Sequence, residues 1–347
     1  MPSKLERILP KFKGTQLKQL AFLCGAKSSG KKSEMVERLA RLAKTQSDSQ
    51  AAGKEKLVLS IDLGIRNLGF ALLTPDASAR PSGLPSTAPE LRQPSRVNLQ
   101  AWRRRELLEV LPDAPTDPER FSPASLAVAA DRLVRRDFLP LGPTHVLIER
   151  QRWRSGGGSA VQEWTLRVNT LEAMLHASLR TMRELGQWSG DVASVAPDRV
   201  TRFWPAPAPA DDVIKTRSTK AVVQKEGKGA KSQLTSKKHK IGVLASWLAK
   251  GHGGQVIIPA NGGAEDAVRQ YRARLPGAPR RRSGKGDQVR DPGDRKLDDL
   301  TDCLLQAVAW LKWQENSELL LDEDWIEELL ELDLLDQDEA NTILDDV

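Results

Sequence analysis

The chain of 347 residues contains only two cysteines, Cys24 and Cys303, which stand far apart in the sequence. Their number excludes a disulfide scaffold and a four-cysteine zinc site, and it suits a reducing compartment. The four histidines are scattered and lack the spacing of a zinc site. No Walker loop and no GxGxxG motif precedes a predicted helix, so we predict no nucleotide cofactor.

Long apolar runs are absent too. No stretch approaches the roughly 18 to 20 uninterrupted apolar residues of a membrane-spanning helix. The first residues lack the apolar core of a secretory signal, and residues 1–13 include Glu6 and are not rich in arginine and serine, unlike a transit peptide. We therefore expect a protein that does not associate with a membrane.

The chain does have an excess of positive charge. From Glu315 to Val347 there are 14 acidic residues and no lysine or arginine, which leaves 53 basic and 32 acidic residues before them, a net charge of +21. A body this basic is typical of proteins that bind polyanions, most often nucleic acid. On charge alone, a basic protein without such a ligand is the alternative.

The pattern of apolar and breaker residues divides the chain into four parts. They are a small helical module with a lysine-rich face (1–44), a flexible linker (45–55), a main domain with basic loop insertions near 205–240 and 275–295 (56–314), and an acidic tail (315–347). The tail could cover the basic surface, contact a partner subunit or mimic DNA, and the sequence leaves these roles open.

Within the main domain, residue periodicity predicts an α/β order of three strands, helix, strand, helix, strand and helix. The predicted strands cover 57–61, 68–73, 96–102, 144–149 and 191–196, and the predicted helices cover 122–138, 161–185 and 297–313.

The most informative residues are acids in apolar surroundings, where a carboxylate is costly unless its charge is compensated. Asp62 and Glu149 each end an apolar strand, and Asp298, Asp299 and Asp302 begin the last helix. Asp302 stands at i+4 from Asp298 and at i+3 from Asp299, so either pair shares one side of the helix and repels. All three places can converge at one sheet edge, and oxygen ligands without His or Cys suit Mg²⁺ or Mn²⁺. Two such ions could promote phosphodiester hydrolysis.

Each acid also has a simpler interpretation when it is taken alone. Asp62 could be a turn residue, Glu149 could pair with a nearby arginine, and the aspartates could favour the dipole at a helix start. In a chain with this much basic charge, the three places together favour a metal site.

Three segments resemble the fungal mitochondrial Holliday-junction resolvases. They are residues 60–71 (SIDLGIRNLGFA), 148–152 (IERQR) and 296–310 (KLDDLTDCLLQAVAW). These enzymes belong with the RuvC-type nucleases in the ribonuclease H-like superfamily. The resemblance implies an α/β fold with a mixed five-stranded sheet flanked by helices, in the element order predicted above. Residues 1–44 resemble a SAP module, a small helical DNA-binding unit.

The resemblance implies a homodimeric endonuclease that makes paired, symmetric nicks in four-way DNA junctions during mitochondrial DNA recombination. Two active sites would match the two-fold symmetry of the junction. It also implies that Asp62, Glu149, Asp298 and Asp302 are catalytic residues that hold two Mg²⁺ or Mn²⁺ ions, with Asp299 as a further ligand or a residue just behind them. Localisation in the mitochondrion is implied by the family alone.

Basic residues near these acids are candidates for contacts to the DNA phosphates that flank the cut. They are Arg66, Arg150, Arg152 and Arg154; Lys237 and Lys238, in a separate basic run, are further DNA-binding candidates. Solvated surface charge is the simpler interpretation of each. Trp153 could stack on unpaired bases at the centre of a junction, or it could belong to the core.

Two other functions fit parts of the sequence. The DLG-x-R-N run also resembles the phosphate loop of actin-like ATPases, but the chain has no second glycine-rich phosphate loop and no second lobe. A non-catalytic, SAP-type architectural DNA-binding protein would explain the basic charge. It would leave the converging acids unexplained, because carboxylates repel phosphate.

Overall fold

The computed structural model describes most of the chain, and all statements below concern the described residues. These are residues 4–51, 53, 55–64, 68–79, 84, 85, 87, 89–107, 121–151, 163–204, 228–249, 255–275 and 297–331. Arg66, Arg152, Trp153 and Arg154 lie outside this set, as do most of both predicted basic insertions and the end of the acidic tail.

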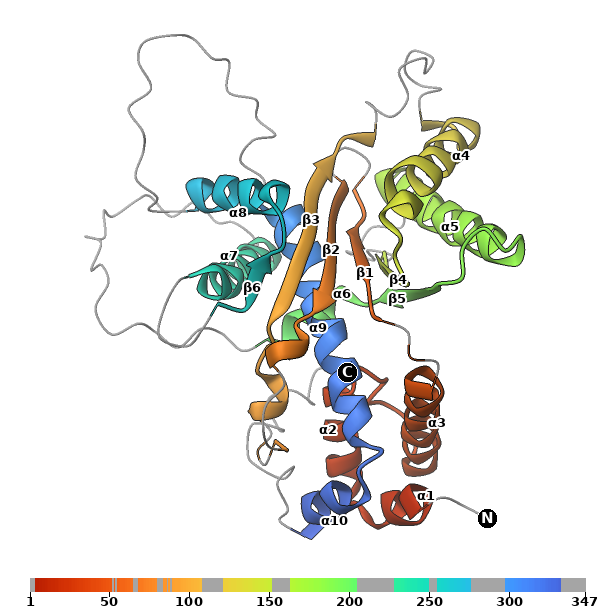
Figure 1. The fold of residues 1–347 in the computed structure, drawn as a ribbon, viewed down its shortest axis with the longest axis vertical. Coiled ribbons are helices and arrows are strands. Elements are labelled where there is room, and N and C mark those ends of the chain that lie inside the picture. The colour runs from red at the N-terminus through yellow and green to blue at the C-terminus, as the bar shows by residue number, and fades with distance from the viewer. Residues whose placement is uncertain are drawn as a thin grey trace, which may run out of the picture.

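The described strands form one mixed sheet of six strands in the order β5-β4-β1-β2-β3-β6 (Figure 1). They are β1 (Val58–Asp62), β2 (Leu68–Pro75), β3 (Val97–Arg105), β4 (His145–Glu149), β5 (Asp191–Val195) and β6 (Ile257–Pro259). Neighbours β1 and β2, and β2 and β3, are antiparallel, whereas β4 lies parallel to β1, β5 to β4 and β6 to β3. The mixed sheet that the resemblance implies is confirmed, and the predicted elements occur in the predicted order. Three further helices (Pro197–Phe203, Lys228–Leu248 and Gly262–Arg274) and β6, none of them predicted, stand between β5 and the last predicted helix. The sequence predicts five strands, because β6 is too short to show an alternating pattern.

Helices cover both faces of the sheet and form a separate group at one end of the molecule (Figure 1). They are α1 (Lys4–Ile8), α2 (Gly14–Leu23), α3 (Lys32–Ala51), α4 (Pro123–Arg132), α5 (Glu163–Glu184), α6 (Pro197–Phe203), α7 (Lys228–Leu248), α8 (Gly262–Arg274), α9 (Asp298–Leu319) and α10 (Glu323–Glu331). Short 3-10 or π turns occur at Leu9–Lys11, Ala77–Ala79, Glu90–Arg92, Leu133–Phe138 and Leu139–Leu141. None of the described helices is both long enough and apolar enough to cross a membrane.

The alternation of side chains along the strands divides the interior into two apolar layers. Leu59 and Ile61 of β1 pack with α4 and α5 on one face. Val58 of β1 and Leu147 of β4 point to the other face, where α9 lies. The strands therefore present alternate residues to α9, and this alternation decides which side chains can reach that helix.

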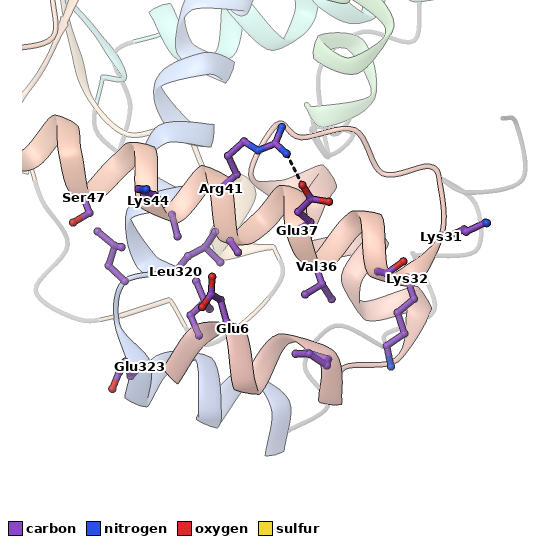
Figure 2. Close-up of a pocket in the computed structure, with 16 residues that line it drawn as sticks. Glu6, Lys31, Lys32, Val36, Glu37, Arg41, Lys44, Ser47, Leu320 and Glu323 are labelled. Carbon is purple, nitrogen blue, oxygen red and sulfur yellow. Dashed lines mark hydrogen bonds and ion pairs between the residues drawn. The ribbon is translucent and has the colours of Figure 1, made fainter. Parts of the chain in front are cut away.

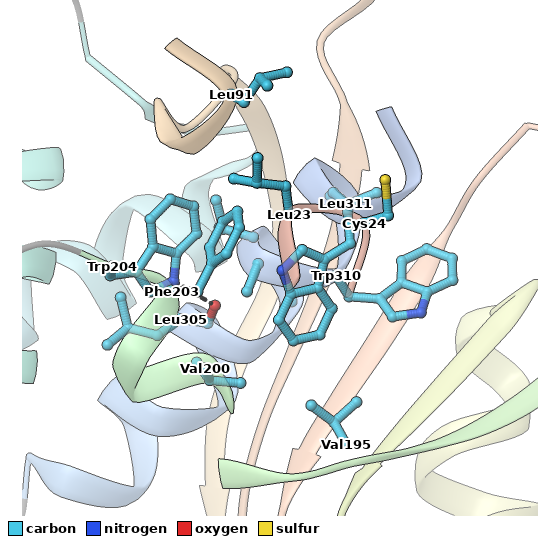
Figure 3. Packing of buried hydrophobic residues seen from close by; sticks show 14 of the residues in the cluster. Leu23, Cys24, Leu91, Val195, Val200, Phe203, Trp204, Leu305, Trp310 and Leu311 are labelled. Atoms are coloured by element: carbon cyan, nitrogen blue, oxygen red, sulfur yellow. Dashed lines mark hydrogen bonds between the residues drawn. The ribbon is translucent and has the colours of Figure 1, made fainter. Parts of the chain in front are cut away.

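The N-terminal helices share the core of the α9 face. Figure 3 shows Leu23 and Cys24 next to Trp310 and Leu311 of α9, in one continuous buried cluster. Both cysteines are buried free thiols. Deleting the N-terminal helices would expose this apolar surface, so they do not form a unit that can be removed cleanly.

Three predicted boundaries differ from the structure. Residues 228–240, inside the basic loop insertion predicted near 205–240, belong to α7. Residues 45–51 of the predicted flexible linker are the last turns of α3, because they contain no breaker before Gly53, which adopts a left-handed φ of 60°. Residues 315–331 of the predicted tail belong to α9 and α10. Lys4 of α1 lies 3.4 Å from Glu327 of α10, so the start of the acidic segment packs on the N-terminal helices.

Polar contacts fix the N-terminal helices on the end of α9. The Asn316 side chain donates to the carbonyl oxygens of Leu23 (2.8 Å) and Leu91 (2.9 Å). Gly25 has a left-handed φ of 67°, and a Cβ there would lie 2.5 Å from the Trp313 ring. Only glycine satisfies both conditions.

We expect Gly25→Ala to destabilise the protein by about 2 kcal/mol or more, because left-handed strain adds to overlap with the Trp313 ring. The control is Gly186→Ala, since Gly186 has nearly the same φ, 69°, but open space around it. Urea unfolding of both variants separates the two effects. Equal losses would mean that the Trp313 contact contributes nothing.

Candidate active site

Asp62 and Glu149 lie next to each other at the ends of parallel strands. Ile61 of β1 is in register with Ile148 of β4, so the acid that follows each of them stands at the same edge of the sheet. Asp62 lies on the same face of its strand as Val58 and Ser60, and Glu149 lies on the same face as Leu147. Both acids are therefore on the α9 face. The backbone register explains why two strand-ending acids can act at one place.

A glycine on β2 lets the start of α9 approach these acids closely. Gly69 pairs with Asp62 in the sheet. A Cβ at position 69 would overlap the Asp299 carbonyl oxygen and lie 2.8 Å from its carbonyl carbon. The first turn of α9 therefore rests on the backbone of β2, directly beside Asp62.

Hydrogen bonds then fix α9 along the sheet. The Gln306 amide donates to Ser60 Oγ at 3.0 Å, and the Trp102 indole donates to the Leu300 carbonyl at 2.9 Å. The hydroxyls of Tyr271 and Thr301 are 2.7 Å apart. All these groups are buried, so the rotation of α9 and the direction of its acids are well defined.

Burial and neighbouring carboxylates raise the pKa of Asp62 and of Asp302. Burial raises the pKa of Asp62 well above its usual range, and the Glu149 carboxylate raises it further through its charge and a shared hydrogen bond. The charges of Asp302 and Asp299 add to this effect. Burial also raises the pKa of Asp302 to about 6, although Lys240 opposes the shift. A cation placed among these groups would remove the repulsion.

Two lysines of α7 reach the aspartates of α9. Lys237 Nζ lies 2.6 Å from Asp298, and Lys240 Nζ lies 3.1 Å from the carboxylate of Asp302. Sequence reasoning missed these ion pairs. The i and i+3 spacing of the lysines on one helix, opposite the i and i+4 spacing of the aspartates on another, could have indicated them.

The residues fit a hard divalent cation by their donor chemistry, since every candidate ligand is a carboxylate oxygen. A closed ligand set of three or more side chains is not formed in the part of the chain that the structure describes. Asp298 and Asp302 contact the lysines of α7 instead. The sheet holds Asp62 and Glu149 next to each other, and these two residues form the centre of the candidate site.

The structure describes only some of the residues that are predicted to contact DNA. Arg150, directly after Glu149, is exposed, and so is Lys238. Lys237, also predicted to contact DNA, is paired with Asp298. Trp310 and Trp313 of α9 are buried in the core.

A groove of about 1260 Å³ lies elsewhere, between α1 and α3 near the end of α9 (Figure 2). Val36 and Leu320 line it, with Glu37 and Arg41 paired at its rim. None of the five predicted metal ligands lines this groove, so it is separate from the carboxylate site.

Comparison with known proteins gives three related findings. Residues 58–320 match the family described as mitochondrial resolvase Ydc2 / RNA splicing MRS1. The protein named cruciform cutting endonuclease 1, mitochondrial, of Schizosaccharomyces pombe is 26% identical over 302 residues, which cover 86% of this chain and 91% of that protein. The protein of the same name from Saccharomyces cerevisiae is 24% identical over 328 residues, covering 88% and 83%.

Among solved structures, the yeast mitochondrial Holliday junction resolvase Ydc2 matches with a TM-score of 0.55 and 22% identity. The match covers 91% of this chain and 99% of that one. The two chains therefore share a fold, the ribonuclease H-like fold that the family resemblance implies.

Proposed function

Because the chain belongs to the family of the mitochondrial resolvase Ydc2 and the RNA-splicing protein MRS1, we propose that it resolves four-way DNA junctions. It is an endonuclease of the mitochondrion. The observation that carries the proposal is the pairing of Asp62 and Glu149 on the α9 face, with Asp302 close enough to raise the pKa of Asp62. These carboxylates stand in a body of net charge +21, which attracts a polyanion.

Asp62, Glu149, Asp298 and Asp302 would hold divalent metal, Mg²⁺ or Mn²⁺, with Asp299 beside them. When bound, two such ions would activate a water for in-line attack and neutralise the charge on the leaving oxygen. The residues of the chain position that chemistry: the sheet register holds Asp62 against Glu149, and Gln306 fixes the rotation of α9. Lys237 and Lys240 pair with Asp298 and Asp302, so they would compensate part of the carboxylate charge beside such ions.

We further propose that the enzyme acts as a homodimer and makes paired, symmetric nicks. A four-way junction has two-fold symmetry, so two equivalent sites related by a two-fold axis can cut strands at equivalent positions. The N-terminal helices would serve as a SAP-like DNA-binding module, which is supported by their exposed lysines Lys27, Lys31 and Lys32.

Non-catalytic nucleic-acid binding is the second candidate function, because the family description also names an RNA-splicing protein. A binding protein needs the basic surface but gains nothing from half-buried carboxylates that repel phosphate. The raised pKa of Asp62 marks a costly arrangement that a nuclease needs and a binding protein does not.

A nicking assay distinguishes the two functions. The labelled substrates are a four-way junction, a duplex and a single strand of equal length, each with Mg²⁺ or with EDTA. We expect metal-dependent, paired nicks in the junction alone. Junction or RNA binding without cutting under any divalent ion would favour the non-catalytic function.

Divalent metal should stabilise the protein in a pH-dependent manner. The pKa of Asp302 is raised to about 6 in the folded chain, above the roughly 3.9 of an unfolded aspartate. In EDTA this group therefore makes folding less favourable as the pH rises from about 4 to above 6. Mn²⁺ at a hundredfold excess over its Kd should add about 2.7 kcal/mol at pH 7.5 and much less at pH 5, where protons compete.

Thermal melts with Mn²⁺ or EDTA at the two pH values measure this stabilisation. The Asp62→Asn variant should lose most of the effect at pH 7.5. If it kept the full shift, the ion would bind somewhere else.

A further inference from the structure

Four arginines gather where the N-terminal helices meet the sheet. They come from three parts of the chain. Arg38 is on α3, Arg150 is the residue that follows β4, and Arg199 and Arg202 are on α6. The backbone N–H of Arg150 donates to the Val195 carbonyl at 2.8 Å, and α6 begins two residues after Val195. The end of β4 and the start of α6 are therefore held side by side.

Two of these arginines hold the loop that joins α2 to α3. Arg199 Nη1, on α6 beside the sheet, donates to the carbonyl oxygen of Gly25, which belongs to the N-terminal helices. Arg38 donates to the Lys27 carbonyl and, at 3.3 Å, to the Ser29 carbonyl. The guanidinium groups thus define the position of the loop relative to the sheet.

The cluster carries little compensating negative charge. Arg202 pairs with Asp198 at 2.9 Å, but in the described part of the chain no ion pair involves Arg38, Arg150 or Arg199. Burial lowers the pKa of Arg199, the Asp198 carboxylate opposes this shift, and the charges of Arg150, Arg202 and Arg38 add to the lowering. Guanidinium groups with this much unbalanced charge favour binding of an anion with several acceptor oxygens.

We propose that Arg38, Arg150, Arg199 and Arg202 form a phosphate-binding seam for the DNA arm that leaves the carboxylate site. The seam begins beside Glu149, because Arg150 follows it in the chain, and it ends at the loop of the N-terminal helices. Phosphates bound here would direct the arm from the site onto those helices. The inference rests on the proposed function, since it specifies the path of the DNA that the site would cut.

Salt dependence of junction binding tests the seam, measured in EDTA so that no cutting occurs. The test variant is Arg150→Gln/Arg202→Gln, which leaves the two loop-holding arginines in place. The loss of two phosphate contacts should make the fall in affinity between 50 and 200 mM salt about tenfold smaller than in the wild type.

The matched control is Arg135→Gln/Arg183→Gln, which removes the same charge from two exposed arginines outside the seam. Each of them pairs with one aspartate, as Arg202 does. The control should keep the wild-type salt dependence. Equal changes in both double variants, or no change in either, overturn the seam. A wild-type chain that binds no DNA overturns the proposed function as well.

A tethered cleavage reagent tests the path of the arm directly. Because both native cysteines are buried, an iron chelate can be attached selectively to Lys27→Cys or, as a control, to Leu185→Cys, at the exposed end of α5. We expect scission from position 27 on the arm that carries the nicked phosphate, and none there from position 185. Scission from position 185 alone would contradict the proposed path.

Discussion

The Asp62→Asn variant is expected to lose junction cleavage by at least about a hundredfold and to bind the junction with wild-type affinity. A loss of this size is typical when one preorganised electrostatic group is removed from an active site. Binding should persist, because the basic surface that attracts DNA is unchanged. Cleavage is measured under saturating protein with Mg²⁺, and binding is measured in EDTA.

The stability of this variant distinguishes a catalytic from a structural role. Burial and the Glu149 carboxylate raise the pKa of Asp62, so its ionised form is unfavourable in the folded chain. The neutral asparagine should therefore raise the melting temperature at pH 7.5 in EDTA. Asp266→Asn is the control, because Asp266 is an exposed acid paired with Arg269. A variant of Asp62 that lost stability and binding together with cleavage would be structurally damaged, and the proposed role would be wrong.

The second large effect is expected from Gly69→Ala. The new methyl group would overlap the Asp299 carbonyl and push the first turn of α9 away from β2. Overpacking of this kind costs about 1 to 3 kcal/mol, and a displacement of about 1 Å in a catalytic group can lower the rate about a hundredfold. The cleavage rate of the folded variant should therefore fall much more than its stability.

Gly262→Ala provides the comparison, since Gly262 begins α8 and has open space around it. Circular dichroism melts establish that each variant is folded at the assay temperature. If Gly69→Ala cut junctions at the wild-type rate, the close packing of α9 on β2 would not be required for catalysis.

Local sequence patterns predict much of the fold. Alternating apolar residues predict the strands that end at Asp62 and Glu149, and the spacing of leucines predicts α9 with its acids at the start. The structure places Asp62 and Glu149 at one sheet edge as the sequence predicts, because the register follows from the pairing of two apolar strands. The local sequence missed β6, which has only three residues, the helices α6, α7 and α8, and the last turns of α3.

The sequence by itself determined the candidate carboxylates, the basic charge and the order of the predicted elements, all of which depend on residue type and short spacings. Only the tertiary structure decided how these parts meet. Asn316 bonds to Leu23 across 293 residues, Lys240 pairs with Asp302 from another helix, and Gly69 matters because α9 lies against it. Such contacts depend on backbone approach and side-chain direction in three dimensions, and no local pattern along the chain encodes them.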